Sequence, residues 1–400
     1  MFRVAQFWLT YEITGSILSL GLVGAANAIP AIFFYLFGVV FADRLDKRRL
    51  IMGTQIATSS LIFLLATLTL LGSVETWHVL AIAFLAGGVE AFDNPGRQAL
   101  YPHLIDRKVM MSAVAMNSVI WQGTRIIAPG IAGVLIDLIN TESALYISRT
   151  GFVVLAMVMA RLKIAPIPRG ASGNPFQDIK VGLKFIKTNS IFSFLIGMTF
   201  FNSFFGMAYI TLMPVFAKDI LEAGARGQGL LLGTSGAGAL IYTLYIGARG
   251  NVPNRGLTII GGAVIFGLAV AAFALTSRYV GSFSLAMAIM FIMGIFNSMY
   301  MISIQSSLQI MVPDHIRGRV MGFYGMTWSI MPLGGVQASG LASLFTAPIA
   351  IAIGGLAVVL FALGPATLNP KVRDLSSNLT PLRDEAAQAE APRTKAGRDD

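Results

Sequence analysis

The chain has 400 residues, of which 55% are hydrophobic and only 12% are charged, with a net charge of +10. A soluble protein usually carries about 25% charged residues, so this composition argues against a soluble fold and predicts an outer surface that faces lipid. The absence of cysteine excludes disulfides, thiolate nucleophiles and Cys-ligated metals. The three histidines stand far apart, and no hydrolase, P-loop or zinc-protease motif occurs. The sequence therefore predicts no enzyme, no cofactor and no metal site.

Twelve apolar segments along the chain predict an all-α, polytopic membrane protein. They cover residues 2–14, 18–42, 50–71, 78–99, 115–138, 144–161, 191–215, 227–247, 257–276, 282–305, 320–344 and 348–366. The first segment would reach only about 20 Å at 1.5 Å per residue, against about 30 Å for a hydrocarbon core. We therefore expect this first segment to be half a helix, truncated relative to a full span.

The basic residues are distributed unevenly between alternating loops, and this distribution predicts the topology. Sixteen of them lie in one set of loops, at 44–49, 107–108, 161–187, 249–255 and 317–319, and three lie in the other set, at 218, 226 and 278. The positive-inside rule places the richer set in the cytoplasm, so the net charge indicates orientation and not nucleic-acid binding. We expect a protein of the bacterial cytoplasmic (inner) membrane, with both termini of the full-length form in the cytoplasm.

A central polar segment separates two groups of six apolar segments. The predicted organisation is a six-helix half at 1–163, a cytoplasmic linker at 164–189, a second six-helix half at 190–366 and a disordered cytoplasmic tail at 367–400. Within the linker, Lys180, Lys184 and Lys187 share one face of an amphipathic helix. This pattern predicts either a helix that lies on the inner membrane surface or a solvated linker helix.

A weak internal repeat indicates that the two halves are related. Phe92-Asp93-Asn94 in the fourth segment resembles Phe296-Asn297-Ser298 in the tenth, and each is followed by a loop of similar sequence. Two six-helix halves with pseudo-symmetry and a central cytoplasmic linker are typical of a secondary transporter.

The loop after the second segment carries a family resemblance. Its run from Gly38 to Arg49 resembles the major facilitator signature small-x-x-x-D-R-x-G-R-R, and departs from it at Val39 and Asp46, where that superfamily usually has glycine. An aspartate at the position of Asp46 resembles the signature of one subgroup, the enterobactin-exporter-like and macrolide-efflux-like carriers. That subgroup is also resembled at residues 11–16, 92–100, 116–118 and 313–320. The resemblance covers the chain to about residue 370 and implies the major facilitator fold with two pseudo-symmetric six-helix halves.

The resemblance also implies a set of gating residues. They are Asp43, Arg44, Arg48 and Arg97 near the cytoplasmic side, and Pro129, Gly130 and Gly133 in the fifth segment, where the run from Arg125 resembles the antiporter signature G-x-x-x-G-P-x-x-G-G. By resemblance, Asp43 latches the two halves, and a carboxylate is attracted to the positive N-terminus of the eleventh segment near Val320. The alternative is that this loop is a solvated turn that only fixes topology. The antiporter signature favours export over import.

Charged residues within the apolar segments mark candidate coupling residues, because charge inside a membrane is costly and usually functional. Glu90, Asp93 and Arg97 share one face of the fourth segment. Counted from the helix ends, Glu90, Arg125 and Arg3 lie at one level near mid-membrane. We expect Glu90, Arg125, Asp93 and Arg3 to couple protonation to transport. The alternative for these residues is a static ion pair that holds helices together.

Aromatic and amide side chains in the second half predict a substrate cavity that is mostly apolar with a few polar groups. The candidate cavity residues are Phe201, Asn202, Phe205, Asn297, Tyr300 and Tyr324. The second half has no acidic residue at mid-segment.

The sequence as a whole predicts a secondary active transporter. The expected activity is proton-coupled export of a hydrophobic or amphipathic small molecule, such as a drug or a siderophore, by alternating access. The expected partners are this substrate, protons and the lipid bilayer, and the expected state is a monomer. Two alternatives stay open: a facilitator that imports a nutrient, and a membrane scaffold or sensor that transports nothing.

Overall fold

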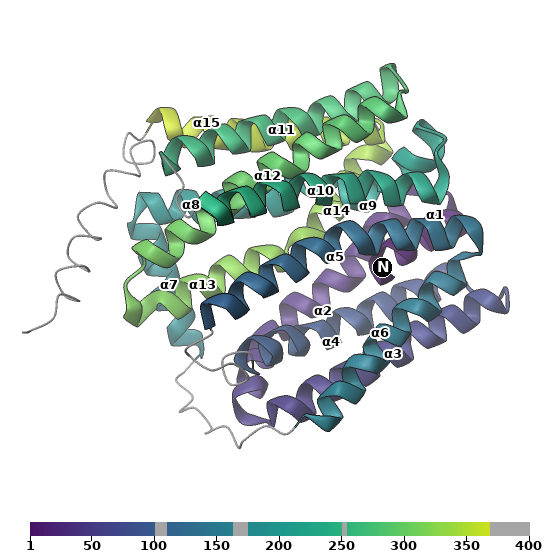
Figure 1. The fold of residues 1–400 in the computed structure, drawn as a ribbon, viewed down its shortest axis with the longest axis horizontal. Helices are drawn as coiled ribbons and strands as arrows, with labels where there is room; N and C mark the ends of the chain where they lie inside the picture. The colour runs from purple at the N-terminus through teal and green to yellow at the C-terminus, as the bar shows by residue number, and fades with distance from the viewer. Residues whose placement is uncertain (101–109, 163–174, 250–253, 369–400) are drawn as a thin grey trace, which may run out of the picture.

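The computed structural model describes residues 1–100, 110–162, 175–249 and 254–368. Within these ranges the chain is helical apart from short connections (Figure 1). Eight of the described helices are long and apolar enough to cross a membrane. The predicted tail and the first part of the predicted linker lie outside the described residues.

The first half contains six helices, and their bounds follow the predicted segments closely. They are α1 (Phe2–Thr14), α2 (Ile17–Arg44), α3 (Lys47–Leu70), α4 (Thr76–Leu100), α5 (Met110–Leu138) and α6 (Thr141–Arg161). The α1 helix ends at Gly15, whose φ of 57° lies in the left-handed region that glycine adopts without steric cost. The side chain of Asp46 accepts a hydrogen bond from the backbone N–H of Arg49 and so caps the start of α3.

The second half follows the helix α7 (Pro175–Thr188) and has two interrupted spans. Its elements are α8 (Ser190–Phe201), the π-helical turn η3 (Asn202–Gly206), α9 (Tyr209–Val215), the π-helical turn η4 (Phe216–Ile220), α10 (Gly224–Arg249), α11 (Arg255–Tyr279), α12 (Phe283–Met311), α13 (Asp314–Ser329), α14 (Met331–Leu344) and α15 (Ala347–Leu368). The predicted seventh segment is therefore a chain of short helices from α8 to η4. The predicted eleventh segment is divided into α13 and α14 beside Pro332, since proline cannot donate the hydrogen bond that would continue the helix.

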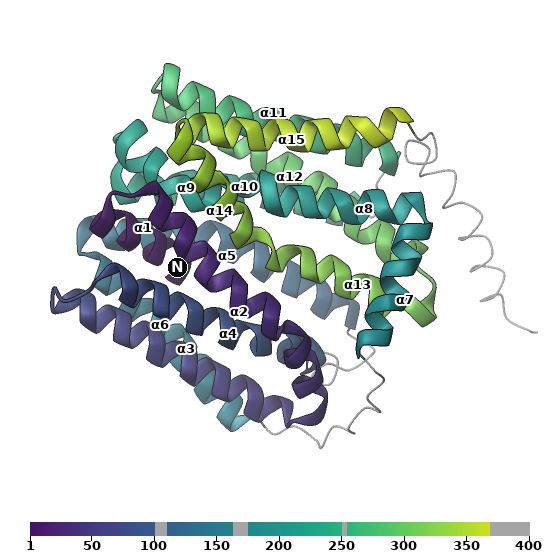
Figure 2. The same cartoon turned by 180° about the vertical axis from the view of Figure 1, so that it is seen from behind.

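The two halves repeat one packing scheme, as the sequence repeat predicts. In the first half, α2 packs along α4 and α3 packs along α6, and in the second half α10 packs along α12 and α11 packs along α15. The halves meet along two seams, α5 against α10 and α2 against α14. Figures 1 and 2 show the first half in purple to blue on one side of these seams and the second half in green to yellow on the other.

Small residues bring the helices of both seams close together. A Cβ on Gly133 of α5 would lie 2.5 Å from the backbone oxygen of Ala225, and a Cβ on Gly229 of α10 would lie 2.6 Å from the backbone oxygen of Pro129. In the other seam, a Cβ on Gly21 of α2 would lie 2.7 Å from Cβ of Ser339. All three contacts lie toward the helix ends that the charge distribution predicts to face outward. The two halves are therefore tightly joined at this predicted outer end.

Candidate transport site

The centre of the first half holds an ion pair between α1 and α4. The guanidinium of Arg3 donates a hydrogen bond to a carboxylate oxygen of Glu90 and another, at 3.0 Å, to Oδ1 of Asn27 on α2. The Nδ2 of Asn27 in turn donates to the backbone oxygen of Ala83, at 3.3 Å. Arg3 of α1 thus joins α2 and α4 through its contacts with Asn27 and Glu90.

This ion pair lies well away from the predicted outer ends of α1 and α4 and is partly exposed. Arg3 lies about 16 Å along α1 from its end at Thr14, and Glu90 lies about 21 Å along α4 from its start at Thr76. Both positions fall inside a hydrocarbon core of about 30 Å. The side chains of Arg3 and Glu90 are 43% and 42% exposed. The predicted role of Glu90 in proton coupling stays a prediction.

The structure brings two of the four predicted coupling residues together and places a third in a separate cluster. The side chain of Arg125 lies outside the described residues, so its predicted pairing with Glu90 stays a prediction. Asp93 has its own partners, one turn along α4 from Glu90.

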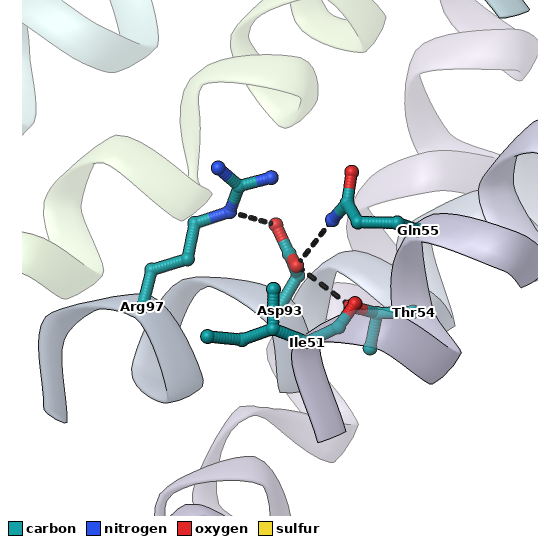
Figure 3. Close-up of polar contacts among 5 residues, drawn as sticks. All are labelled: Ile51, Thr54, Gln55, Asp93 and Arg97. Atoms are coloured by element: carbon teal, nitrogen blue, oxygen red, sulfur yellow. Dashed lines mark hydrogen bonds and ion pairs between the residues drawn. The ribbon is translucent and has the colours of Figure 1, made fainter. Parts of the chain in front are cut away.

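The carboxylate of Asp93 is surrounded by three donors (Figure 3). Its Oδ1 accepts hydrogen bonds from Oγ1 of Thr54 at 2.7 Å and from Nε2 of Gln55 at 2.6 Å, and its Oδ2 accepts from Nε of Arg97 at 2.7 Å. Thr54 and Gln55 belong to α3, while Arg97 follows Asp93 by one turn of α4. The Asp93 side chain is 17% exposed. This arrangement ties α3 to α4 and is more constrained than the Arg3–Glu90 pair.

The predicted gating residues fall into two groups. Arg48, at the start of α3, donates from Nε to the backbone oxygen of Met159 at 2.6 Å and also donates to the backbone oxygen of Ala160. It therefore satisfies carbonyls at the last turn of α6, where a cation is favoured by the helix dipole. The side chains of Asp43 and Arg44 lie outside the described residues, so the predicted latch stays a prediction.

The second gating group lies directly on a seam between the halves. Pro129 and Gly133 of α5 face Gly229 of α10, and Gly130 has its Cα 3.3 Å from the position of a Cβ on Gly229. Close contact of small residues is the usual means of helix association in membranes. The residues that resemble the antiporter signature are thus the ones that join the two halves.

The candidate cavity residues of the second half make packing contacts. Asn202, Asn297 and Tyr300 are at most 4% exposed. Nδ2 of Asn297 donates to Oδ1 of Asn202 at 3.0 Å, and the hydroxyl of Tyr300 donates to the same oxygen. These three side chains form a polar cluster between η3 and α12, inside the second half.

The remaining candidates lie beside that cluster or face α15. The ring of Phe201 stacks on Phe361 of α15 with centroids 4.0 Å apart, and Phe205 lies 5.3 Å from Phe201. Tyr324 of α13 is partly buried against the same core. Three of the six candidates are thus buried in one polar cluster, and the role of all six as substrate contacts stays a prediction.

Two features of the described residues had escaped sequence reasoning. The hydroxyl of Tyr11 on α1 donates a hydrogen bond to Asp219 on η4, which joins the two halves at the predicted outer end. Arg149 of α6 has its guanidinium 4.2 Å from the ring centroid of Phe63 on α3, and its Nε is buried without a hydrogen-bond partner. A signal for Arg149 was visible, because it is a charge inside the segment 144–161. Nothing in the sequence linked Tyr11 to Asp219, which are 208 positions apart.

A cavity of about 420 Å³ opens at the predicted outer end of the first half. It lies between α1, α3, α5 and α6, and its lining includes Glu12, Thr141 and Glu142. Thr141 donates to the carboxylate of Glu12 at 3.0 Å. The cavity is thus separate from the Arg3–Glu90 pair.

In the part of the chain that the structure describes, two helical halves are joined along glycine-lined seams, and an ion pair links helices inside the first half; this arrangement defines a secondary transporter of the major facilitator class. Comparison with known families agrees: the chain matches the major facilitator family described as transmembrane secretion effector over residues 1–395 and belongs to it. It is therefore an integral membrane transporter and not an enzyme.

Relatives of known function are efflux proteins and a siderophore transporter. The chain is 24% identical to the staphyloferrin A transporter of Staphylococcus aureus, over 93% of this chain and 92% of that one. It is 24% identical to the multidrug efflux pump Tap of Mycolicibacterium fortuitum, over 85% and 84%. It is 22% identical to macrolide efflux protein A of Streptococcus pyogenes, over 82% and 81%.

The fold is also that of a solved transporter. The crystal structure of the nucleoside transporter NupG superposes with a TM-score of 0.65, covering 91% of this chain and 96% of that chain at 15% identity. This likeness confirms the predicted major facilitator fold.

Proposed function

We propose that this protein is a proton-driven exporter of a hydrophobic or amphipathic small molecule and works by alternating access. The observation that carries the proposal is the Arg3–Glu90 ion pair, which we place near mid-membrane and which is about 40% exposed. The efflux relatives, which handle several drugs or macrolides, support the export direction. The glycine-lined seams support a rocking motion of the two halves, with 1–163 and 190–366 as the moving bodies.

In the proposed cycle, the proton acts on the contact between α1 and α4. An ionised Glu90 attracts Arg3 and holds α1 against α4. A proton on Glu90 removes that attraction and leaves Arg3 with its hydrogen bond to Asn27. The contact between α1 and α4 is therefore weaker in the protonated form, and the two forms favour different arrangements of the first half. This difference is what couples proton binding to the conformational change.

The proposal includes the setting in which the transporter works. We place it in a bacterial cytoplasmic membrane as a monomer, with the loops rich in basic residues in the cytoplasm. This orientation puts the tight seams and the Tyr11–Asp219 contact on the outer side. The structure then corresponds to a form in which the route to the outside is closed.

The test is transport into proteoliposomes with an imposed pH gradient, with a macrolide and a siderophore as separate probes and binding measured alongside. Glu90→Gln should still bind a transported probe but should no longer concentrate it against a gradient. The matched control is Glu75→Gln, which changes an exposed carboxylate in the loop before α4 and should transport as the wild type does. Full gradient-driven transport by Glu90→Gln would falsify the proposed coupling role. If the wild-type protein moves neither probe, the proposed substrate class is wrong, and the coupling role of Glu90 is a separate question.

A further inference from the structure

The helix α7 lies where the second half enters the membrane. It ends at Thr188, and after Asn189 the chain begins α8 at Ser190. The stretch from Ser190 to Ile220 is long and apolar enough to span the membrane. Because one residue separates α7 from this span, we expect α7 to lie at the membrane surface, and Figure 2 shows it at the end of the helix bundle.

One face of α7 is fixed to the protein. Ile186 is 5% exposed, and the ring of Phe185 lies 4.9 Å from that of Phe192 on α8. A Cβ on Gly182 would lie 3.0 Å from the ring of Phe323 and 3.2 Å from Cβ of Arg319, both on α13. Gly182 therefore allows α7 to approach α13 closely, and Figure 2 shows α7 lying across the end of α13.

The opposite face of α7 is basic and partly apolar. Lys180, Lys184 and Lys187 are all exposed and follow one another at helical spacing, and none of them forms an ion pair within the described part of the chain. Val181 is 43% exposed and Leu183 is 39% exposed. A partner for this face must offer negative charge and a hydrocarbon layer together, at the depth where α8 enters the membrane. Anionic phospholipids have this chemistry.

We propose that α7 is a docking surface for anionic phospholipids of the membrane leaflet next to it, and that its contact at Gly182 transmits this attraction to α13. Each lysine held near an anionic surface favours binding by about fivefold. Lipid binding then holds α7 against the membrane and thereby holds α13, the half-span that carries Tyr324. This inference does not depend on which substrate is moved or in which direction.

The first test measures lipid retention on the full chain by native mass spectrometry. The protein is incubated in detergent with equal amounts of phosphatidylglycerol and phosphatidylcholine. Wild type should retain phosphatidylglycerol preferentially, and Lys180→Gln/Lys184→Gln/Lys187→Gln should reduce that preference by about fivefold or more. The matched control, Arg161→Gln/Arg249→Gln, removes exposed charges from other helix ends on the same predicted side and should leave the preference unchanged. An equal preference in the triple variant and the wild type would overturn the proposal, as would an equal loss in the control.

The second test reports on α13 without any transport assay. Since the chain has no cysteine, Gly318→Cys places one thiol on α13, at an exposed glycine with open space around it. Its rate of maleimide labelling should differ at least twofold between vesicles of phosphatidylglycerol and of phosphatidylcholine. The triple lysine variant should abolish this difference. A labelling rate that is the same in both lipids would show that α7 does not act on α13, and a soluble acidic partner for α7 would then fit better.

Discussion

The hydroxyl of Tyr11 in the first half donates a hydrogen bond to the carboxylate of Asp219 in the second half, at the predicted outer end of the molecule. The ammonium of Lys218 lies 5.7 Å from the centre of the same tyrosine ring. The two halves must separate here if the outer side is to open. This hydrogen bond therefore belongs to the closed form of the outer side and is broken in the open form.

Asp219→Asn should shift the protein toward the form that is open at this end. The asparagine oxygen can still accept from Tyr11, but a hydrogen bond to a neutral group is worth about 1 kcal/mol less than one to a charged group, so the open population should rise about fivefold. Ser339→Cys supplies the reporter, because Ser339 is fully buried in the seam against Gly21 and the chain has no cysteine of its own. Labelling by an impermeant maleimide should be about fivefold faster in the Asp219→Asn background. Asp137→Asn, at an exposed carboxylate at the same end, is the control and should leave the rate unchanged.

Gly229→Ala should destabilise the seam between α5 and α10. The added methyl group would lie 2.6 Å from the backbone oxygen of Pro129, which is too close for an unstrained contact. Overpacking of this kind costs about 1–3 kcal/mol, so the midpoint of thermal unfolding in detergent should fall by several degrees. Gly247→Ala is the control in the same helix, because a Cβ added at Gly247 would have no neighbouring atom within 4 Å. The higher helix propensity of alanine should make this variant neutral or slightly more stable. Equal midpoints for the two variants would mean that the seam can widen at no cost.

Much of this fold could be predicted from residue patterns, because apolar length and helix rise are local properties. The predicted first segment has the same bounds as α1, and the shared depth of Arg3 and Glu90 followed from counting residues along their helices. Pro332 is a local signal for the division between α13 and α14, whereas the π-helical turn at Asn202 depends on packing between helices, which no local pattern indicates. For the same reason, the burial of Asn202 against Tyr300 could not be distinguished in advance from a place on a cavity wall.

Asp93→Asn should lower stability more than Glu90→Gln does. Asp93 accepts from two donors on α3 and from Arg97, so an asparagine amide group would face one of these donors with its own N–H. A polar group left unsatisfied in a mostly buried position costs about 1–3 kcal/mol. Glutamine in place of Glu90 keeps an oxygen that can accept from Arg3, and Arg3 also keeps its hydrogen bond to Asn27, so no donor is left unsatisfied. Thermal unfolding of both variants in the same detergent gives the comparison, and the opposite order would mean that Asp93 is the weaker structural contact.

Replacing Arg3 or Arg149, two of the arginines within helices of the first half, by leucine should have unequal effects. Arg149 lies against the ring of Phe63 and has no carboxylate partner among the described residues, so Arg149→Leu removes a costly charge without leaving another one unpaired. The loss of a cation–π contact costs about 1–2 kcal/mol, which the removed desolvation penalty offsets. Arg3→Leu, by contrast, leaves Glu90 and Asn27 without their shared donor. We expect the free energy of unfolding of Arg149→Leu to lie within about 1 kcal/mol of the wild-type value, and that of Arg3→Leu to be lower by a larger margin.

The double variant Arg3→Leu/Glu90→Gln should recover part of that loss, because it leaves no carboxylate unpaired. If the double variant is no more stable than Arg3→Leu alone, then Arg3 stabilises the protein through Asn27 or through packing, and the charge of Glu90 contributes little.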